Sequence, residues 1–424
     1  MRHALPVLLI ACTPLAPFSQ KGGDDTDDAD RGGDSGVPTD TFGDSDTLGP
    51  GDSGDDTGLA DGCRAGRPRP DASRFALVSH PVDAAGDQDD LWEVLQLGTD
   101  GALGQTGRSF RMGRGYGEPV RFAPDGSLAV AIQTDGSLSV VTLDAQGTPK
   151  VVVTGYEDDG AGGDFYAYDV LFDPGGERLW VLDGNWAGKN GGGIYALDLD
   201  CTTGMPTARG FVLPSKLGTH LFPAPGGRHL LVAKEVMDSG PSGQVHLVDL
   251  DPPTLLGSVA LWADDEAIIG GAALGGDGSY VIVGDNAGFS TIENRVGVAR
   301  LSGGKLTPVQ VLPDLLDPIA IGTWGAATLV ASGFGNGLVP LAFDAGSQPP
   351  FARRPALTTV GGPSQLPGVI EVVPAPGGDA WMLVTEVSGI RRLRATPAGE
   401  ITDLGAFSFG DGLEGIVGSL GVQP

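Results

Sequence analysis

The sequence has 424 residues, of which 71 are glycine and 19% are charged. This length exceeds the roughly 250–300 residues at which a single hydrophobic core stops growing, so we expect several domains or one large repetitive domain. The glycine content disfavours a helical protein, because an interior glycine costs a helix about 1 kcal/mol relative to alanine. The 54 acidic and 26 basic residues give a net charge of −28, which argues against nucleic acid and anionic lipid as partners.

The N-terminus has the features of an export signal. Arg2 and His3 precede a short apolar run over residues 4–10, and Leu9-Ile10-Ala11-Cys12 resembles the bacterial lipobox. This resemblance implies a signal peptide over residues 1–11, a lipid on Cys12 and attachment to a membrane through that lipid alone. Because no aspartate follows Cys12, we expect the outer membrane or the cell surface. The alternative is an ordinary secretory signal that is cut slightly later and releases the protein.

Residues 12–63 are predicted to be a disordered linker. Positions 21–62 contain 13 Asp, 11 Gly and no Glu, and their net charge is 2 − 13 = −11. Such a segment cannot bury enough apolar surface to offset its conformational entropy. Repulsion between its charges should extend it into a stalk between the anchor and the folded part.

From about residue 64 onward the sequence repeats with a period of about 50 residues. A turn signature recurs at Pro124-Asp125-Gly126, Pro174-Gly175-Gly176, Pro225-Gly226-Gly227, Gly276-Asp277-Gly278 and Pro376-Gly377-Gly378. Short apolar runs follow the turns and predict buried strands over 128–132, 179–182, 230–233, 280–283, 329–331 and 381–384. Alternating segments come next and predict strands over 138–143, 194–199, 245–250, 296–301, 338–343 and 390–393.

Four strands per unit of this length are typical of a β-propeller, in which the faces of each blade are buried only by its neighbours. We therefore predict an all-β, seven-bladed propeller over residues 64–424, with four antiparallel strands per blade. The first unit lacks an inner strand of its own. We expect Leu413 to Val417 to supply that strand and to close the ring by joining a blade built from residues 73–115. The alternative is six blades followed by a tail.

The segment at 171–183, Leu-Phe-Asp-Pro-Gly-Gly-Glu-Arg-Leu-Trp-Val-Leu-Asp, continues to Ile-Tyr-Ala-Leu-Asp-Leu-Asp at 194–200. It resembles the repeat of bacterial YVTN or lactonase-type propellers, and the resemblance covers nearly all of the chain beyond residue 64. It implies the architecture more strongly than an activity, because propellers of this kind include binding proteins and enzymes.

The ends of the second strands are predicted to lie on the face that carries the mouth of the central channel. Most of them are acidic or otherwise polar: His80, Gln133, Asp183, Glu235, Asp285 and Glu386. Exposed hairpin ends account for this composition without any function. Alternatively, the acidic face attracts a cation, a small-molecule ligand or a basic protein partner.

A second set of polar residues is predicted on the inner strands. Asp169, His220 and Glu371 each stand five residues before the turn proline, which places them at one level of the channel on three blades. Glu118 lies one position earlier in its blade, and Glu414 lies in the predicted closing strand. Carboxylates and an imidazole that converge in this way predict a metal site, with calcium favoured and zinc an alternative if His220 is a ligand.

Glu118 and Glu414 also stand in segments similar to inner-strand motifs of gluconolactonase-type and phytase-like esterase propellers. That resemblance implies calcium-binding glutamates at these positions. The chain departs from those families because their fuller set of Asn and Asp ligands is not matched.

Three cysteines remain to be assigned. If Cys12 carries a lipid, Cys63 and Cys201 are the only pair left, and an exported protein meets an oxidising environment. We predict a disulfide that fastens the end of the stalk to the propeller. The alternative is two unpaired cysteines.

The strong architecture and the weak catalytic signatures favour a cell-envelope lipoprotein that presents a propeller as a monomeric, non-catalytic scaffold for a ligand or protein. The alternative is a calcium-dependent lactonase or phosphoester hydrolase with its site at the channel mouth, where a bound ion would polarise the ester carbonyl.

Overall fold

The computed structural model describes residues 62–158, 165–183, 192–214, 218–233, 243–262, 269–285, 295–315, 317–332, 337–357, 368–410 and 412–424. Residues Ala60–Pro424 belong to one compact unit. The predicted signal peptide, Cys12 and nearly all of the predicted linker lie outside the described residues. Within the described ranges, no helix combines the length and the apolar character that a bilayer crossing requires.

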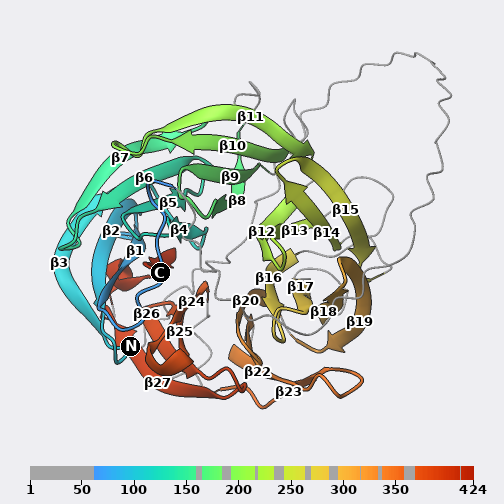
Figure 1. The fold of residues 1–424 in the computed structure, drawn as a ribbon. Coiled ribbons are helices and arrows are strands. Elements are labelled where there is room, and N and C mark those ends of the chain that lie inside the picture. Colours follow the sequence, from blue (N-terminus) through green and yellow to red (C-terminus); the bar gives the residue numbers. More distant parts are fainter. Residues whose placement is uncertain are drawn as a thin grey trace, which may run out of the picture. The chain divides into compact units, whose positions relative to one another are not determined.

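The described residues form seven antiparallel sheets of four strands each, arranged as the blades of a ring (Figure 1). From the channel outward, blade 1 contains β28 (Leu420–Val422), β1 (Arg74–Val82), β2 (Gln88–Leu97) and β3 (Leu103–Arg111). Blade 2 contains β4 (Val120–Phe122), β5 (Leu128–Ile132), β6 (Leu138–Leu143) and β7 (Pro149–Tyr156). Blade 3 contains β8 (Ala167–Phe172), β9 (Arg178–Asp183), β10 (Gly193–Leu199) and β11 (Pro206–Pro214).

The other four blades follow the same order. Blade 4 contains β12 (Gly218–Ala224), β13 (Arg228–Ala233), β14 (Gln244–Leu250) and β15 (Pro253–Ala260). Blade 5 contains β16 (Ile269–Gly275), β17 (Tyr280–Asp285), β18 (Arg295–Ser302) and β19 (Lys305–Pro313). Blade 6 contains β20 (Pro318–Trp324), β21 (Ala327–Ser332), β22 (Gly337–Phe343) and β23 (Phe351–Arg353), and blade 7 contains β24 (Ile370–Pro374), β25 (Ala380–Glu386), β26 (Gly389–Ala395) and β27 (Ile401–Ser408).

The second strands carry most of the core, as their uninterrupted apolar runs predict. Every residue of β5, β17, β21 and β25 is buried, because blades on both sides cover these strands. The core clusters join neighbouring blades. One of them packs Val130 of β5 against Val181 of β9, and another contains Ala76 of β1 and Leu383 of β25. The outer strands are mostly half-buried or exposed, and β3 alternates between the two after its first residue.

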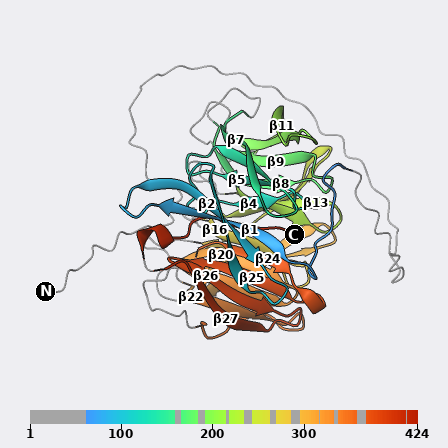
Figure 2. The same cartoon turned by 90° about the vertical axis from the view of Figure 1, so that its left-hand side faces the viewer.

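The two ends of the repeat region close the ring, which confirms the predicted topology but corrects the closing segment. β28 pairs with β1 through Ala76↔Val422 and Val78↔Leu420, and the end of the chain, marked C, lies near β1 (Figure 2). Leu413 to Val417 is therefore not the inner strand of blade 1. Residues Leu413–Gly415 form the 3-10 helix η2, in which the N–H of Ile416 donates to the carbonyl of Leu413. The apolar composition of this segment resembles a strand, but Gly415 and Ile416 form local turn hydrogen bonds and the N–H of Val417 donates to the carbonyl of Val387.

A pair of serines holds the closing segment in place. The backbone N–H of Ser419 donates to Ser79 Oγ at 2.7 Å, and that hydroxyl donates to the carbonyl of Gly115 at 2.7 Å. Ser79 and Ser419 are both buried. The Ser79 hydroxyl thus links β1, the segment before β28 and the loop before β4, where blades 1 and 2 meet.

A disulfide joins Cys63 and Cys201, the pair predicted from the sequence. Its S–S distance is 2.08 Å, and the two residues are separated by 138 positions. The adjacent Arg64 donates from its backbone to the carbonyl of Gly175, and its side chain donates to the Ser127 hydroxyl at 2.9 Å. The start of the described chain is therefore fastened to the turns that enter the second strands of blades 2 and 3.

Candidate functional site

Four polar side chains from the inner strands gather in the central channel. Arg121 on β4 is the hub: its Nη1 lies 3.1 Å from Glu371 Oε1 on β24, and its Nη2 lies 3.6 Å from Asp169 Oδ1 on β8. His220 on β12 lies close enough for the charges of Asp169 and Arg121 to affect its pKa. We call Arg121, Asp169, His220 and Glu371 the channel cluster. Sequence analysis predicted that the last three share a level, and the structure places them around one arginine.

Backbone hydrogen bonds fix the carboxylate of Asp169. Its Oδ2 accepts from the N–H of Leu221 on the adjacent blade at 3.0 Å, and its Oδ1 accepts from the N–H of Val170 at 2.9 Å. The Asp169 side chain is only 3% exposed. β8 and β12 are each paired in register with the second strand of their blade. The two backbone hydrogen bonds therefore hold the Asp169 carboxylate in a fixed position where blades 3 and 4 meet.

Arg121 was missed by the sequence analysis, although a signal for it exists. It stands three residues before the turn at Pro124, whereas the equivalent positions in other blades are apolar: Leu171, Phe222, Ala273 and Val373. A single charged residue among apolar residues at equivalent positions indicates that this inner strand does more than pack against its neighbours. Because side chains alternate along a strand, Arg121 shares its side with the position two residues earlier, which is equivalent to Asp169. Its length then allows it to reach back to that level.

The channel cluster combines burial with opposite charges. Burial raises the pKa of Glu371 to about 7; Arg121 counteracts this shift and the negative charge of Asp169 adds to it. Burial alone would lower the pKa of Arg121, but the charges of Asp169 and Glu371 raise it. Burial also lowers the pKa of His220, and this shift favours the neutral form of the imidazole. The Arg121 side chain is 38% exposed, so one member of the cluster meets solvent.

The other two predicted metal ligands do not join the cluster. Glu118 accepts from the backbone N–H of Tyr116 at 2.5 Å and from Ser419 Oγ at 3.5 Å, and burial raises its pKa. Glu414 is exposed on η2, because the closing strand begins further along the chain.

The donor set does not fit a metal ion. Among the described residues, the five predicted ligands contain no group of three whose ligand atoms lie within 4.8 Å of one another. The position between Asp169 and Glu371, where a cation would be favoured, is taken by the guanidinium of Arg121. Calcium therefore stays a prediction from the sequence.

The predicted acidic face is corrected where the structure describes it. Asp183, Asp285 and Glu386 are 0%, 0% and 3% exposed. Each is still paired with the third strand of its blade, so it is part of the sheet rather than of a free hairpin end. Arg295 Nε donates to Asp285 at 2.9 Å, and Arg391 Nε donates to Glu386 at 2.6 Å. These carboxylates stabilise the blades and do not form an exposed anionic surface.

His80 is also structural, and Glu235 lies outside the described residues. The His80 side chain is 5% exposed; its Nδ1 lies 3.2 Å from the carbonyl oxygen of Ile416, and its Nε2 lies 3.5 Å from Glu93 Oε2. Its ring packs edge-on against Phe409 with centroids 4.7 Å apart. His80 thus fastens the segment before the closing strand to β1. This structural role accounts for a histidine at the end of β1, and no ligand is needed to explain it.

Taken together, the channel cluster contains a cation that can hold an anionic oxygen, a carboxyl group that titrates near neutral pH and an imidazole whose neutral form is favoured. A carboxyl group with a pKa near the working pH can both accept and donate a proton. A guanidinium beside it can stabilise negative charge that develops on oxygen. The cluster can therefore support acid–base chemistry on a carbonyl compound.

Comparison with known proteins shows the fold. No protein-family model matches the sequence, and no curated protein matches it either. A structure assigned as a 6-phosphogluconolactonase from Bacteroides uniformis is 12% identical, with a TM-score of 0.57 over 82% of this chain and 99% of that one. The periplasmic gluconolactonase of Pseudomonas aeruginosa is 17% identical, with a TM-score of 0.57 over 83% of this chain and 99% of that one. A hypothetical selenium-binding protein of Sulfolobus tokodaii is 12% identical, with a TM-score of 0.59 over 85% and 97%.

These similarities define the class of protein as a seven-bladed β-propeller of the architecture that 6-phosphogluconolactonase-like proteins share. At identities of 12–17% they assign no residue of this chain a role.

Proposed function

We propose that this protein is a hydrolase that opens a lactone or a related ester in the central channel. The observation that carries the proposal is the channel cluster: Arg121 is held between Asp169 and Glu371 in a channel where the pKa of Glu371 is about 7. The lactonase names of two structural neighbours support the same reading over that of a non-catalytic scaffold.

In this proposal Glu371 moves the proton. Its carboxylate takes a proton from a water molecule as the water oxygen bonds to the carbonyl carbon of the substrate. Negative charge develops on the carbonyl oxygen, and the guanidinium of Arg121 stabilises it. When the ring C–O bond breaks, the proton held by Glu371 passes to the leaving alkoxide. The products are the open hydroxy acid and the regenerated carboxylate.

The other two residues have supporting roles. Asp169, fixed by the N–H of Leu221, holds the second side of the Arg121 guanidinium and thus orients it. Burial lowers the pKa of His220 and so disfavours a second positive charge in the cluster, which would lower the pKa of Glu371.

The proposal is tested by measuring the hydrolysis of δ-gluconolactone and a panel of other lactones, with the spontaneous rate subtracted. We expect Glu371→Gln to lower kcat/KM by about 10²-fold or more, which is the scale of a lost general base. Glu414→Gln is the matched control, because that glutamate is exposed on η2. It should keep the wild-type rate.

The pH dependence gives a second readout. Because Glu371 acts as a base in its ionised form, kcat/KM should rise with pH through about 7 and then level off. Glu371→Gln should lose this rise. If the protein hydrolyses none of the lactones, or if Glu371→Gln keeps wild-type activity, the proposed hydrolysis is contradicted and a non-catalytic binding scaffold is favoured.

A further inference from the structure

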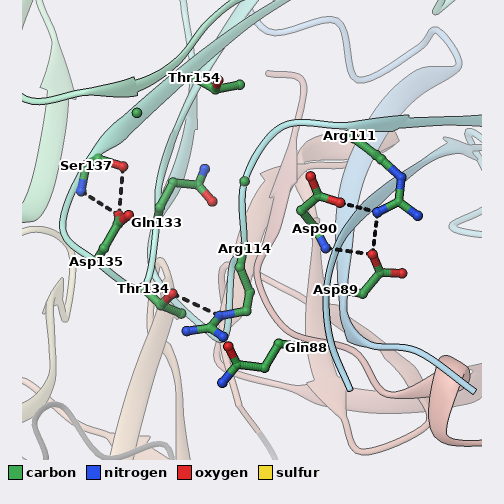
Figure 3. A pocket seen from close by; sticks show the side chains of 12 residues that line it. Gln88, Asp89, Asp90, Arg111, Arg114, Gln133, Thr134, Asp135, Ser137 and Thr154 are labelled. Carbon is green, nitrogen blue, oxygen red and sulfur yellow. Dashed lines mark hydrogen bonds and ion pairs between the residues drawn. The ribbon is translucent and has the colours of Figure 1, made fainter. Parts of the chain in front are cut away.

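A second feature lies outside the channel cluster, in an open groove of about 610 Å³ between blades 1 and 2 (Figure 3). β2 and β3 of blade 1 supply one wall, and the turn after β5 and the end of β7 supply the other. None of the residues that line the groove belongs to the channel cluster. Its volume falls within the roughly 300–1,000 Å³ of small-molecule sites.

Gln133 in this groove is a buried side chain without adequate partners. It is 3% exposed, and its Oε1 has no hydrogen-bond partner. Its Nε2 has one long contact of 3.5 Å, to the carbonyl of Ala131. Buried polar groups are nearly always paired in native structures. The amide lies between the side that carries Ser137 and the side that carries Arg114 (Figure 3), so a molecule in the groove could supply its missing partner.

The charged groups around Gln133 are already held in position. Arg111 forms ion pairs with Asp89, at 2.5 Å, and with Asp90. Arg114 Nε donates to the hydroxyl of Thr134 at 3.1 Å. A lining that is fixed before a ligand arrives loses little conformational entropy on binding.

The opposite side of the groove is fixed in the same way. Asp135 accepts from the backbone N–H of Ser137 at 3.0 Å and from its hydroxyl at 2.7 Å. Three aspartates and two arginines line the groove, so it offers both hydrogen-bond donors and acceptors.

We propose that this groove binds a neutral polyhydroxylated molecule, such as a saccharide unit. Neighbouring hydroxyl groups act as donor and acceptor at once, and they match the planar amide, carboxylate and guanidinium groups that line the groove. A strongly charged ligand would meet like charges on one wall, and an apolar ligand would leave Gln133 unpaired. This inference does not depend on the proposed hydrolysis.

The experiment measures binding of glucose, galactose, N-acetylglucosamine and cellobiose to the full chain by saturation-transfer NMR and calorimetric titration. We expect at least one saccharide to bind at millimolar concentration. Gln133→Leu should weaken that binding about tenfold, the scale of one well-placed hydrogen bond. Gln96→Leu is the matched control, because Gln96 is exposed on β2 and does not line the groove. It should bind as the wild type does.

A second variant, at a surface residue, tests the proposal even if Gln133→Leu does not fold. The Arg111 side chain is 62% exposed, so Arg111→Ala should keep the fold and still weaken saccharide binding. Sodium phosphate and L-arginine serve as charged probes in the same titrations. The proposal is overturned if no saccharide binds, if only a charged probe binds, or if saccharide binding is unchanged in Arg111→Ala.

Discussion

Arg121 and Glu371 are 250 positions apart in the sequence, yet Arg121 Nη1 donates to Glu371 Oε1 at 3.1 Å. They belong to the inner strands of blades 2 and 7, and blade 1 stands between these blades in the ring (Figure 1). The inner strand of blade 1 is β28, from the end of the chain. The ion pair therefore spans the blade that contains both the first and the last strand of the described chain.

The raised pKa of Glu371 has a consequence for stability. Its folded pKa of about 7 lies above the ordinary 4.5, so the folded protein holds this proton between those values when the unfolded chain has lost it. The contribution of Glu371 is therefore fully present below pH 4.5 and is lost as the pH rises through about 7. We expect the free energy of unfolding of the wild type, relative to Glu371→Gln, to fall by on the order of 2–3 kcal/mol between pH 4.5 and 8. Urea unfolding at both pH values measures this difference, and a constant difference would contradict the shift.

The correction of the acidic face leads to a second prediction, on Glu386. The guanidinium of Arg391 has no exposed surface, and Glu386 accepts from its Nε at 2.6 Å. Glu386→Ala would leave a buried charge whose remaining carboxylate partner is Asp403, so we expect a loss of about 3–5 kcal/mol in unfolding free energy. The control is Arg209→Ala, which removes an exposed ion pair with Asp198 and should cost less than about 1 kcal/mol. Equal losses in the two variants would mean that Glu386 does not stabilise the blade.

Closure of the ring can be tested at one glycine. A Cβ atom on Gly421 of β28 would lie 2.5 Å from Val120 Cγ1 and 3.0 Å from the Val120 backbone oxygen. Gly421→Ala should therefore force β28 away from β4 and cost about 1–3 kcal/mol. Gly104 on β3 is the matched control, since a Cβ there meets nothing within 4 Å. Thermal unfolding should separate the two variants, and equal melting temperatures would contradict the contact between β28 and β4.

The disulfide should stabilise the protein by restricting the conformations of the unfolded chain. Cys63 and Cys201 close a loop whose ends are 138 positions apart, and the chain-entropy model gives such a loop about 5 kcal/mol. The Cys63→Ser, Cys201→Ser double variant should have a lower melting temperature, and non-reducing peptide mapping of the wild type should find the two cysteines in one linked pair. Free thiols at both positions would contradict this bond.

Much of the fold could be predicted because each blade repeats the same local pattern. The apolar run at 128–132 and the alternating segment at 138–143 coincide with β5 and β6. The closing strand was placed too early because Leu413 to Val417 has strand-like composition, and only its turn hydrogen bonds show otherwise.

Three of the four residues in the channel cluster could be predicted because the repeated turns fix the register of the inner strands. Counting back from the turn prolines brought together Asp169, His220 and Glu371, because the turn sets the register of each inner strand. The same counting could not find Arg121, whose position differs but whose long side chain reaches their level. Nor could it show that Asp183 and Asp285 are buried, because burial there depends on the neighbouring blade.

The central claim is that Arg121 acts in the opening of a lactone in the channel. Its most direct test is the kcat/KM for lactone hydrolysis of Arg121→Leu beside Arg209→Leu, an exposed arginine on the outer strand β11. We expect a loss of about 10²–10³-fold for Arg121→Leu, as for a removed oxyanion donor, and no change for Arg209→Leu. Wild-type activity in a folded Arg121→Leu variant would contradict it.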